Sequence, residues 1–249
     1  MKSVWKITEN YRNSEIVPLF SSLEKVMGVE GDDITHSPIS WVKRVRFGGK
    51  NYYVKVYTQA GKGLRKYIGR SRIRAEWENL LYFHQLSVPT APVVAYGESF
   101  EFGLFKGGAL ITEELVGTDD LAELAIAESP LLKDANWVAK VSEQLSRLTR
   151  RLHKNRFVHN DLKWRNVLVT TLQEPRLFLI DCPQGRRLFG PMLQRGIIKD
   201  LACIDKVAKY QLSKTQRLRF YLQYMKQSSL QSSDKARLRK VLAFFEGRE

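Results

Sequence analysis

A short polar segment in the second half of the chain carries residue types that can transfer a phosphoryl group. Residues 157–169 read FVHNDLKWRNVLV, in which Asp161 and Asn166 stand five positions apart in an H-x-D-L-x-x-x-N pattern. Phosphoryl transfer needs a carboxylate that orients and deprotonates an acceptor hydroxyl, with an oxygen ligand for Mg²⁺ close to it. The spacing therefore predicts one rigid loop that supplies both groups.

A second acid, Asp181, follows an apolar run at residues 177–180. Between Asn166 and this run lie three apolar residues and a polar turn that ends in Glu174-Pro175. The order predicts a β-hairpin whose two ends bring Asn166 and Asp181 together. An H-x-D triplet by itself is more often a loop with a capping aspartate, but the joint pattern favours a kinase-type metal site.

A lysine within a predicted strand can neutralise the phosphates of a nucleotide. Residues 39–57 predict two strands joined by a turn at Gly48-Gly49-Lys50-Asn51, and alternation in the second strand separates its apolar residues from Lys55. A solvated strand lysine is the other interpretation. The downstream loop favours a nucleotide-binding role for Lys55.

A kinase also needs a glutamate on a helix to hold that lysine. Apolar residues recur at helical spacing over residues 71–86, which predicts a helix. Glu76 shares the apolar face of this helix, whereas Glu78 lies beside Arg74 and is expected to be its solvated partner. We therefore expect Glu76 to pair with Lys55.

The remaining elements follow the order found in kinases. Residues 93–97 and 108–113 predict two further strands. The second strand ends at Glu113, where we expect a hinge whose backbone groups, at Glu113 and Leu115, bind adenine. A plain strand end is the other interpretation. Apolar spacing predicts a helix over 137–152, and the chain from residue 197 onward also has helical periodicity.

These elements predict an α+β, two-lobed protein-kinase-like fold. The N-lobe, residues 1–116, is expected to be an antiparallel sheet with one helix that positions the nucleotide. The C-lobe, residues 117–249, is expected to be mainly helical and to carry the catalytic loop and the metal site. Together they are expected to form one kinase-like domain.

The composition restricts the partners and the compartment. The 249 residues carry a formal net charge of +15, which favours a polyanionic partner. Nucleic acid is disfavoured because no recognition motif is found. With only two cysteines a disulfide framework is not expected, the N-terminus lacks the apolar core of a signal peptide, and no apolar stretch is long enough to span a bilayer. We therefore expect a cytoplasmic protein.

A basic segment precedes and enters the predicted helix at residues 71–86. It is expected to meet an anionic lipid surface or a phosphorylated sugar core, with a mobile, solvated loop as the other interpretation. Its basic residues are Lys62, Arg65, Lys66, Arg70, Arg72 and Arg74.

The residues quoted above resemble the protein-kinase-like superfamily. The pattern from His159 to Asn166, followed by Ile180-Asp181-Cys182-Pro183, carries the resemblance. The chain is most similar to the lipopolysaccharide core kinases, the Kdo/WaaP-like group, and to their InaA-type branch. The supporting segments are 76–80, 88–90, 95–98 and 212–220.

The resemblance implies a kinase that uses ATP and Mg²⁺ to phosphorylate a heptose or Kdo hydroxyl of the lipopolysaccharide inner core. It implies a lipid-linked sugar acceptor in a Gram-negative bacterium and peripheral association with the anionic inner face of the inner membrane; the oligomeric state is not implied. The implied roles are Asp161 as base, Lys163 as γ-phosphate contact, Asn166 and Asp181 as metal ligands, and Lys55 with Glu76 as the nucleotide-positioning pair.

One further acid and several departures bear on this resemblance. Asp200 would brace the catalytic loop, or be a surface residue paired with Lys199 or Lys206. Asn160 stands where many protein kinases have Arg, and Cys182-Pro183 replaces Phe-Gly, so control by an activation loop is not expected. No Gly-rich phosphate loop is present, and residues 35–40 are the candidate in its place. Trp164 is interpreted as a residue that stacks on a sugar.

Two other functions fit the same motifs. The first is a kinase of another small-molecule or protein hydroxyl. The second is a weakly active, regulatory or stress-related pseudokinase, which the missing Gly-rich loop favours and the intact Lys55, Asp161, Asn166 and Asp181 oppose.

Overall fold

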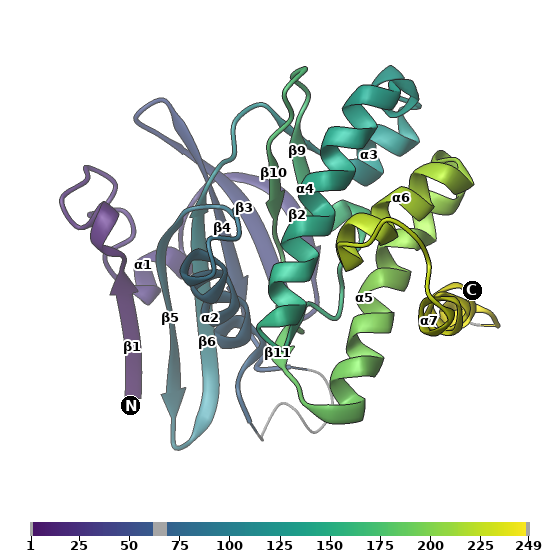
Figure 1. Cartoon of the computed structure of the whole chain (residues 1–249). Helices are drawn as coiled ribbons and strands as arrows, with labels where there is room; N and C mark the ends of the chain where they lie inside the picture. The colour runs from purple at the N-terminus through teal and green to yellow at the C-terminus, as the bar shows by residue number, and fades with distance from the viewer. Residues whose placement is uncertain (1, 62–68, 248–249) are drawn as a thin grey trace. The chain divides into compact units, whose positions relative to one another are not determined.

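The computed structural model describes residues 2–61 and 69–247 (Figure 1). Contacts divide the chain into two units: unit 1 comprises residues 1–82 and 91–116, and unit 2 comprises residues 83–90 and 117–249. Residues 83–90, which the sequence places in the N-lobe, therefore pack with unit 2. Lys62, Arg65 and Lys66 of the basic segment lie outside the described residues.

Six antiparallel strands form the sheet of unit 1. In spatial order they are β1 (Lys2–Ile7), β5 (Val93–Glu101), β6 (Leu104–Glu113), β4 (Lys50–Tyr57), β3 (Ser40–Phe47) and β2 (Asp32–Ser37). The turn between β3 and β4 consists of Gly48 and Gly49, whose φ angles of 56° and 76° suit a type I′ turn that glycine adopts without strain. The predicted hairpin over residues 39–57 is confirmed.

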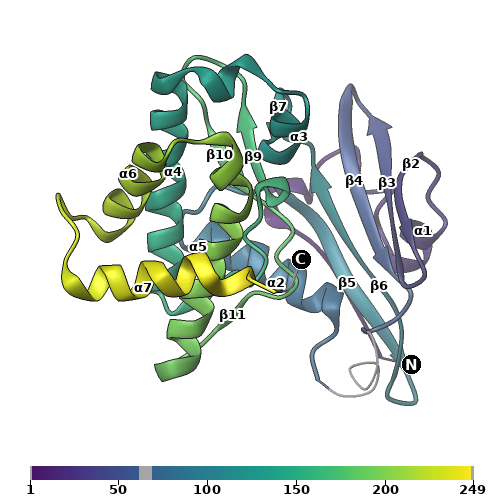
Figure 2. The same cartoon turned by 90° about the vertical axis from the view of Figure 1, so that its right-hand side faces the viewer.

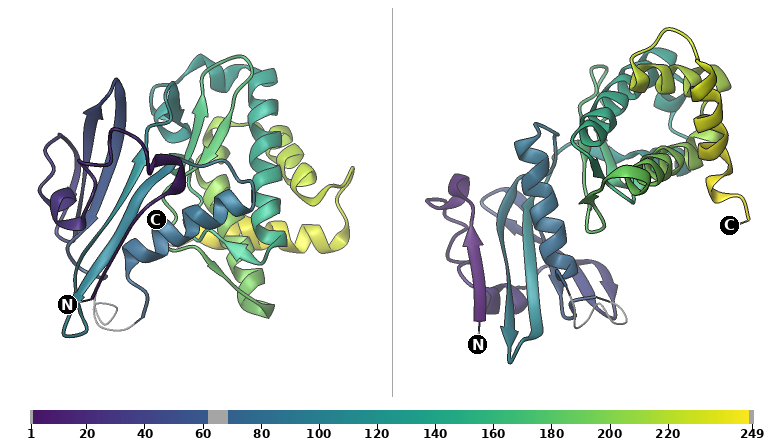
Figure 3. Two further views of the ribbon diagram at one scale, coloured as in Figure 1. Left: turned by 90° about the vertical axis from the view of Figure 1, so that its left-hand side faces the viewer. Right: turned by 60° about the horizontal axis from the view of Figure 1, so that its bottom comes forward.

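Different segments cover the two faces of this sheet (Figure 3). On one face, apolar residues of the segment 16–29, which contains α1 (Leu23–Met27), pack with Val54 and Val56 of β4. On the other face lies α2 (Arg72–Gln85), whose Ile73 approaches β6 so closely that a Cβ on Gly108 would be 2.6 Å from its side chain. This close approach sets the depth at which α2 lies on the sheet. The short η1 (Glu9–Tyr11) follows β1.

Helices make up most of unit 2, and Figure 2 shows α4, α5, α6 and α7 gathered together. The longest helices are α4 (Ala135–Lys154) and α5 (Gly190–Gln211). The remaining ones are α3 (Leu121–Ile126), η3 (Pro130–Lys133), η4 (Trp164–Asn166), α6 (Lys214–Met225), α7 (Ser232–Leu242) and η5 (Ala243–Phe245). The predicted apolar stripe over 137–152 is buried on α4, which confirms that helix.

Two helix starts show how the sequence sets these boundaries. Asp134 caps α4 by accepting hydrogen bonds from the backbone N–H groups of Asn136 and Trp137. Helix α5 begins at Gly190, earlier than the helical periodicity from residue 197 suggested, because Pro191 near its start fits a first turn but contributes no apolar repeat. Across residues 2–61 and 69–247, no helix combines the length and the apolar character that a membrane crossing requires.

Two small sheets complete unit 2. One has the spatial order β10 (Leu177–Leu179), β9 (Val167–Thr170) and β7 (Thr118–Asp120). The other pairs β11 (Arg186–Arg187) with β8 (Phe157–Val158). The polar segment between β8 and β9 is therefore held at both ends by strands.

Candidate active site

The expected ion pair of unit 1 is present between β4 and α2. The Nζ atom of Lys55 lies 2.8 Å from Oε1 of Glu76, and the Glu76 side chain is only 4 % exposed. Lys55 stands in the middle of β4, opposite Leu110 of β6, so the sheet fixes its backbone. Because a carboxylate this buried needs a partner, the pair holds the lysine in one orientation.

The neighbouring glutamate has a different environment. Glu78 is 44 % exposed at its side chain and pairs with Arg70 at 2.8 Å and with Arg74 at 4.0 Å. The prediction that Glu76 faces inward is confirmed, and Glu78 is solvated as predicted, but its near partner is Arg70 rather than Arg74. Arg74 also reaches the buried Glu98 at 2.6 Å, so this end of the basic segment is paired with acids.

The catalytic-loop candidates gather around Asp161 in unit 2. The Nζ atom of Lys163 lies 2.7 Å from Oδ1 of Asp161, and Arg165 approaches Oδ2 at 3.6 Å. The amide nitrogen of Asn166 donates to the Asp161 carbonyl oxygen at 2.8 Å. The loop thus folds back on itself over the five positions from Asp161 to Asn166.

The hairpin β9–β10 returns the chain to Asn166, as predicted. Its register pairs Leu177 with Val169 and Leu179 with Val167. Beyond the last pair, the backbone N–H of Ile180 donates to the carbonyl oxygen of Asn166 at 3.0 Å. This hydrogen bond places Asp181, the next residue, beside Asn166.

Two residues of this region have left-handed backbone conformations. Asn160 has a φ of 64° and Asp181 a φ of 54°. Such angles are uncommon outside glycine, and Asn and Asp tolerate them best. Backbone conformations of this kind concentrate at functional sites, where surrounding contacts hold them.

Asp200 of α5 supplies those contacts. Its carboxylate is fully buried and accepts hydrogen bonds from the backbone N–H groups of His159 and Asn160, both at 2.7 Å. His153 of α4 lies 3.2 Å from the same carboxylate and 2.8 Å from the Tyr224 hydroxyl. Asp200 is therefore the buried brace of the loop, and the alternative of a surface aspartate is wrong.

His159, the first residue of the motif, is enclosed in the core of unit 2. Burial lowers the pKa of its imidazole, which outweighs the opposing influence of Asp200, Asp181 and Asp161. Its ring packs near Phe83, with centroids 6.0 Å apart. His159 thus acts as a neutral, space-filling residue beneath the loop.

The side chains at the expected metal site suit a hard cation. Asn166 and Asp181 offer amide and carboxylate oxygens, which are ligands that Mg²⁺ accepts. Within the described ranges no group of three or more His, Cys, Asp or Glu residues could hold a metal ion. Mg²⁺ commonly completes its coordination with water and substrate phosphates.

The expected hinge residues lie at the end of β6. Glu113 accepts from the Tyr11 hydroxyl at 2.8 Å and pairs with Lys50 at 2.9 Å, and burial together with Glu113 raises the pKa of Tyr11. The backbone N–H of Glu113 donates to the Pro92 carbonyl oxygen. Leu115 follows outside any strand or helix. The side chain of Glu113 thus has a structural task, which the sequence did not indicate.

Two other expectations concern residues 35–40 and Trp164. Residues 35–40 form the ends of β2 and β3 and the turn between them, where the Ser37 hydroxyl accepts from the backbone of Ser40 at 3.1 Å.

Trp164 is 4 % exposed, and its indole N–H donates to the Ile204 carbonyl at 2.9 Å. The interpretation of Trp164 as a sugar-stacking residue is therefore wrong, because the ring is in the core.

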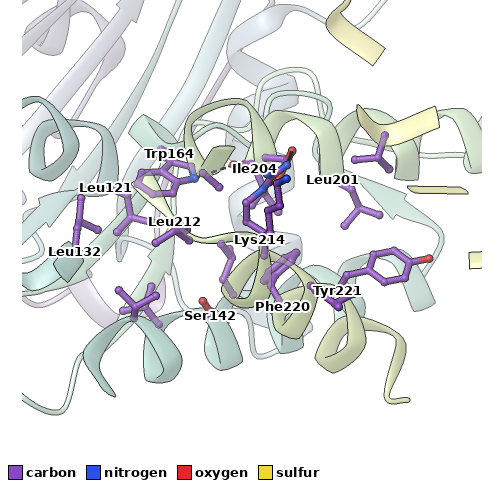
Figure 4. A pocket seen from close by; sticks show the side chains of 18 of the residues that line it. Leu121, Leu132, Ser142, Trp164, Leu201, Ile204, Leu212, Lys214, Phe220 and Tyr221 are labelled. Atoms are coloured by element: carbon purple, nitrogen blue, oxygen red, sulfur yellow. Dashed lines mark hydrogen bonds and ion pairs between the residues drawn. The ribbon is translucent and has the colours of Figure 1, made fainter. Parts of the chain in front are cut away.

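Trp164 instead lines an apolar cavity of about 320 Å³ inside unit 2 (Figure 4). Side chains from α3, η3, α4, α5 and α6 surround the space. Among them are Leu121, Leu132, Val141, Leu201, Leu212 and Phe220. Polar groups such as Lys214, Arg217 and Asp205 also border it, and Arg217 and Asp205 are paired at 2.6 Å.

Comparisons with known proteins identify the family and the fold of this chain. The model of the lipopolysaccharide kinase (Kdo/WaaP) family matches residues 33–224. The chain belongs to this family of kinases. It is 31 % identical over 113 residues to a 3-deoxy-D-manno-octulosonic acid kinase of Actinobacillus succinogenes, a match that spans 45 % of this chain and 44 % of that protein. The chain therefore matches less than half of that relative's length.

A solved structure of WaaP in complex with acyl carrier protein has a similar fold. The TM-score is 0.74, the match covers 99 % of this chain and 97 % of that chain, and the sequence identity is 22 %. At this identity the likeness establishes the fold alone. The predicted kinase-like α+β fold is confirmed, with an antiparallel sheet in unit 1 and a mainly helical unit 2.

Proposed function

We propose that this protein transfers the γ-phosphoryl group of ATP to a sugar hydroxyl of the lipopolysaccharide inner core. The main support is the loop in unit 2, where Asn166 is hydrogen-bonded to Asp161, the hairpin returns Ile180 to Asn166 just before Asp181, and Asp200 braces the loop from below. Membership of the lipopolysaccharide kinase family supports the acceptor class.

In this proposal Asp161 orients the acceptor hydroxyl and accepts its proton. Its side chain is 15 % exposed, so an acceptor can reach it, and Lys163 stands 2.7 Å away. We assign Lys163 to the transferred phosphoryl group, because an ammonium beside the attacking oxygen offsets the charge that develops there.

The metal ligands would be Asn166 and Asp181. The Asn166 amide nitrogen donates to Asp161, which leaves the amide oxygen as the acceptor atom for a cation. Bound Mg²⁺ would neutralise negative charge on the nucleotide phosphates. Asp181 directly follows Ile180, whose backbone N–H donates to the Asn166 carbonyl. This backbone hydrogen bond fixes the main-chain positions of the two residues that would bind the metal.

In unit 1 Lys55 would contact the nucleotide phosphates, with Glu76 holding its ammonium in place. Backbone groups at Glu113 and Leu115 would take the adenine. The ion pair is sheltered on one side, since the Lys55 side chain is 21 % exposed and that of Glu76 only 4 %. Lys55 thus keeps an accessible face for a phosphate.

The acceptor is a heptose or a Kdo residue on a lipid-linked core, and Kdo is the first to test. A 3-deoxy-D-manno-octulosonic acid kinase is among the relatives, although the match covers less than half of its length. We place the reaction at the cytoplasmic face of the inner membrane, because a lipid-linked acceptor requires a membrane surface.

The decisive experiment measures phosphate transfer from labelled ATP to deacylated inner-core fragments that end in Kdo or in heptose. Asp161→Asn should reduce kcat by about 10²–10⁴-fold, the usual contribution of a positioned base. Asp119→Asn, which removes an exposed carboxylate from β7, should leave kcat unchanged.

Transfer to a protein or to a small metabolite, but to neither core fragment, would show that the acceptor is not a sugar of the lipopolysaccharide inner core. Binding of ATP without transfer to any acceptor would instead support a regulatory pseudokinase. Full activity of Asp161→Asn would remove Asp161 from the mechanism.

We further propose an acyl carrier protein as a partner of unit 2. WaaP has been solved in complex with an acyl carrier protein, and the apolar cavity of unit 2 suits the acyl chain that such a carrier bears. Its volume of about 320 Å³ lies at the lower end of the range of roughly 300–1,000 Å³ for ligand pockets.

This partner is tested by calorimetry with carrier protein in its acylated and unacylated forms. The acylated form should bind at least about tenfold more tightly, since apolar chain surface leaves water. Equal affinities would show that the cavity takes no part in binding.

A further inference from the structure

The turn from β11 into α5 carries an unusual surface. Over residues 184–195 the sequence contains three arginines and no acid. Two large apolar side chains are exposed in the same stretch, Phe189 at 62 % and Met192 at 63 %. Figures 1 and 2 show that these first turns of α5 form an outer end of unit 2.

Arg156, at the turn before β8, joins this surface. Its guanidinium lies 5.2 Å from the centre of the Phe189 ring, in cation–π contact. We define the interfacial patch as Arg156, Arg186, Phe189, Met192 and Arg195. Among the described residues, none of its three arginines forms an ion pair, in contrast to Arg70 and Arg74.

The patch is held firmly although its side chains are exposed. Arg186 pairs with Val158 in the β8–β11 ladder, and the Leu188 backbone N–H donates to the Arg156 carbonyl at 2.8 Å. Gly196 lies so close to Val158 that a Cβ there would be 2.8 Å from the valine side chain. The exposed apolar groups are thus presented on a fixed backbone.

The ladder also ties the patch to the catalytic loop of the same unit. Strand β8 ends at Val158, directly before His159, and the side-chain amide of Asn160 donates to the Gln184 carbonyl at 3.0 Å. The strand ladder and this hydrogen bond therefore link the patch to the loop that carries Asp161.

The combination of arginines with exposed apolar side chains in the patch indicates which kind of partner it binds. Arginines around exposed aromatic and aliphatic side chains are the pattern of a segment that lies in the headgroup region of a bilayer. An acidic protein would also attract the arginines, but it gives less reason for two apolar side chains to project together. We propose that the interfacial patch docks this protein on an anionic lipid bilayer.

This inference rests on the proposed function, since it seats the catalytic unit on the membrane that would hold a lipid-linked acceptor. Within the described part of the basic segment, Arg70 and Arg74 are already paired with acids, which favours the interfacial patch as the surface that meets the lipid. Each arginine at an anionic surface is worth roughly a fivefold change in partition coefficient.

The test is sedimentation of the full chain with vesicles of phosphatidylcholine that contain one third phosphatidylglycerol. Arg186→Gln/Arg195→Gln should lower the partition coefficient by about 25-fold. Phe189→Ala should lower it by about tenfold, as expected for loss of a partly inserted ring. Phosphatidylcholine alone should bind the wild type only weakly.

Matched controls remove the same groups elsewhere. Arg147→Gln/Arg219→Gln takes two exposed arginines from α4 and α6, and Leu172→Ala removes a side chain that is 64 % exposed at the β9–β10 turn. Both should bind vesicles nearly as well as the wild type. Equal losses in the controls would mean that overall charge, and not the patch, drives binding, and would overturn the proposal.

The β5–β6 turn is the rival surface, since it exposes Phe102 at 97 % and Leu104 at 53 %. Its Lys106 is paired with Glu101 at 2.8 Å, so it offers less positive charge to an anionic lipid. A loss of binding in Phe102→Ala with none in Phe189→Ala would overturn the proposal. So would patch variants that keep vesicle binding but lose binding to an acidic carrier protein.

Transfer to a soluble core fragment separates this inference from the proposed function. Patch variants that lose vesicle binding should keep wild-type transfer to that fragment, because none of the patch residues belongs to the catalytic loop. A wild type that transfers phosphate but binds no vesicles would overturn the docking alone. A wild type that docks through the patch but transfers nothing would overturn the proposed function alone.

Discussion

A single buried carboxylate explains why the catalytic loop keeps an uncommon backbone. Asp200 receives two backbone N–H groups at 2.7 Å, one of them from Asn160 with its left-handed φ. Because both oxygens of the carboxylate are engaged, the loop is fixed before any ligand binds. The backbone of Asp161 therefore takes its position from the fold rather than from a substrate.

The first prediction concerns this brace. Asp200→Asn replaces one of the two acceptor oxygens by a donor, and we expect a loss of about 2–4 kcal/mol in the free energy of unfolding. Transfer activity should fall with it. Urea unfolding and kcat are the two measurements. Asp205→Asn is the control on the same helix, and since its pair with Arg217 is about one fifth exposed, its loss should be below about 1 kcal/mol.

The second prediction concerns acid stability. The pKa of His159 is lowered by burial, so the unfolded state binds a proton more readily than the folded state. The contribution of His159 to the free energy of unfolding is then fully present above the unfolded pKa of about 6.5. It decreases as the pH falls below that value, by at most about 1.4 kcal/mol per pH unit. His159→Phe should lose less stability than the wild type between pH 7.5 and 5.5 in urea titrations. Parallel curves would show that His159 does not contribute.

At the level of elements, helix α5 depends on a glycine where it crosses β8. A side chain at Gly196 would meet Val158, since a Cβ there would be 2.8 Å from Cγ1. The helix can approach the strand closely only because this position has no side chain. The same contact supports the start of the catalytic loop, which follows Val158.

The third prediction follows from this contact. Gly196→Ala should destabilise the protein by about 1–3 kcal/mol through overpacking. Val158→Ala opens space, so the double variant should recover part of the loss made by Gly196→Ala. A double-mutant cycle from thermal unfolding measures this coupling. Strictly additive losses would show that the two side chains do not compete for the same space.

Local patterns were sufficient for several elements. The hairpin β9–β10, the helix α4 and the hairpin β3–β4 were predictable because their apolar repeats and turn residues lie within one stretch of sequence. The pairing of Glu76 rather than Glu78 with Lys55 followed from helical spacing alone.

Other elements depend on partners far along the chain. Strand β1 pairs with the distant strand β5, from Lys2 with Phe100 to Ile7 with Ala95, and its six residues give little signal by themselves. The burial of Trp164 likewise arises from packing with a distant segment, since its indole N–H donates to the Ile204 carbonyl. The His153–Tyr224 contact that extends the brace joins α4 to α6 and has no local signature.

At the level of the whole molecule, both cysteines are buried thiols of unit 2, and neither takes part in a disulfide. Burial raises the pKa of Cys203 to about 11, because the thiolate is disfavoured in an apolar environment. At neutral pH neither accessibility nor ionisation favours reaction of this thiol.

The fourth prediction is that thiol labelling reports opening of the fold. Iodoacetamide at pH 8 should modify the native protein slowly and the urea-unfolded protein rapidly, as followed by mass spectrometry. Because the folded pKa of Cys203 is raised, its contribution to stability is present below the unfolded pKa near 9 and is lost as the pH rises toward 11. Rapid native labelling at Cys203 would contradict the burial seen here.

The placement of these two thiols makes the natural sequence a ready background for probes. A cysteine introduced at Phe102 in unit 1, or at Leu172 in unit 2, would be the reactive thiol on the native surface, since both positions are strongly exposed. With spin labels at both positions, electron paramagnetic resonance would measure the distance between the two units, with and without nucleotide. The natural cysteines would not have to be removed for this measurement.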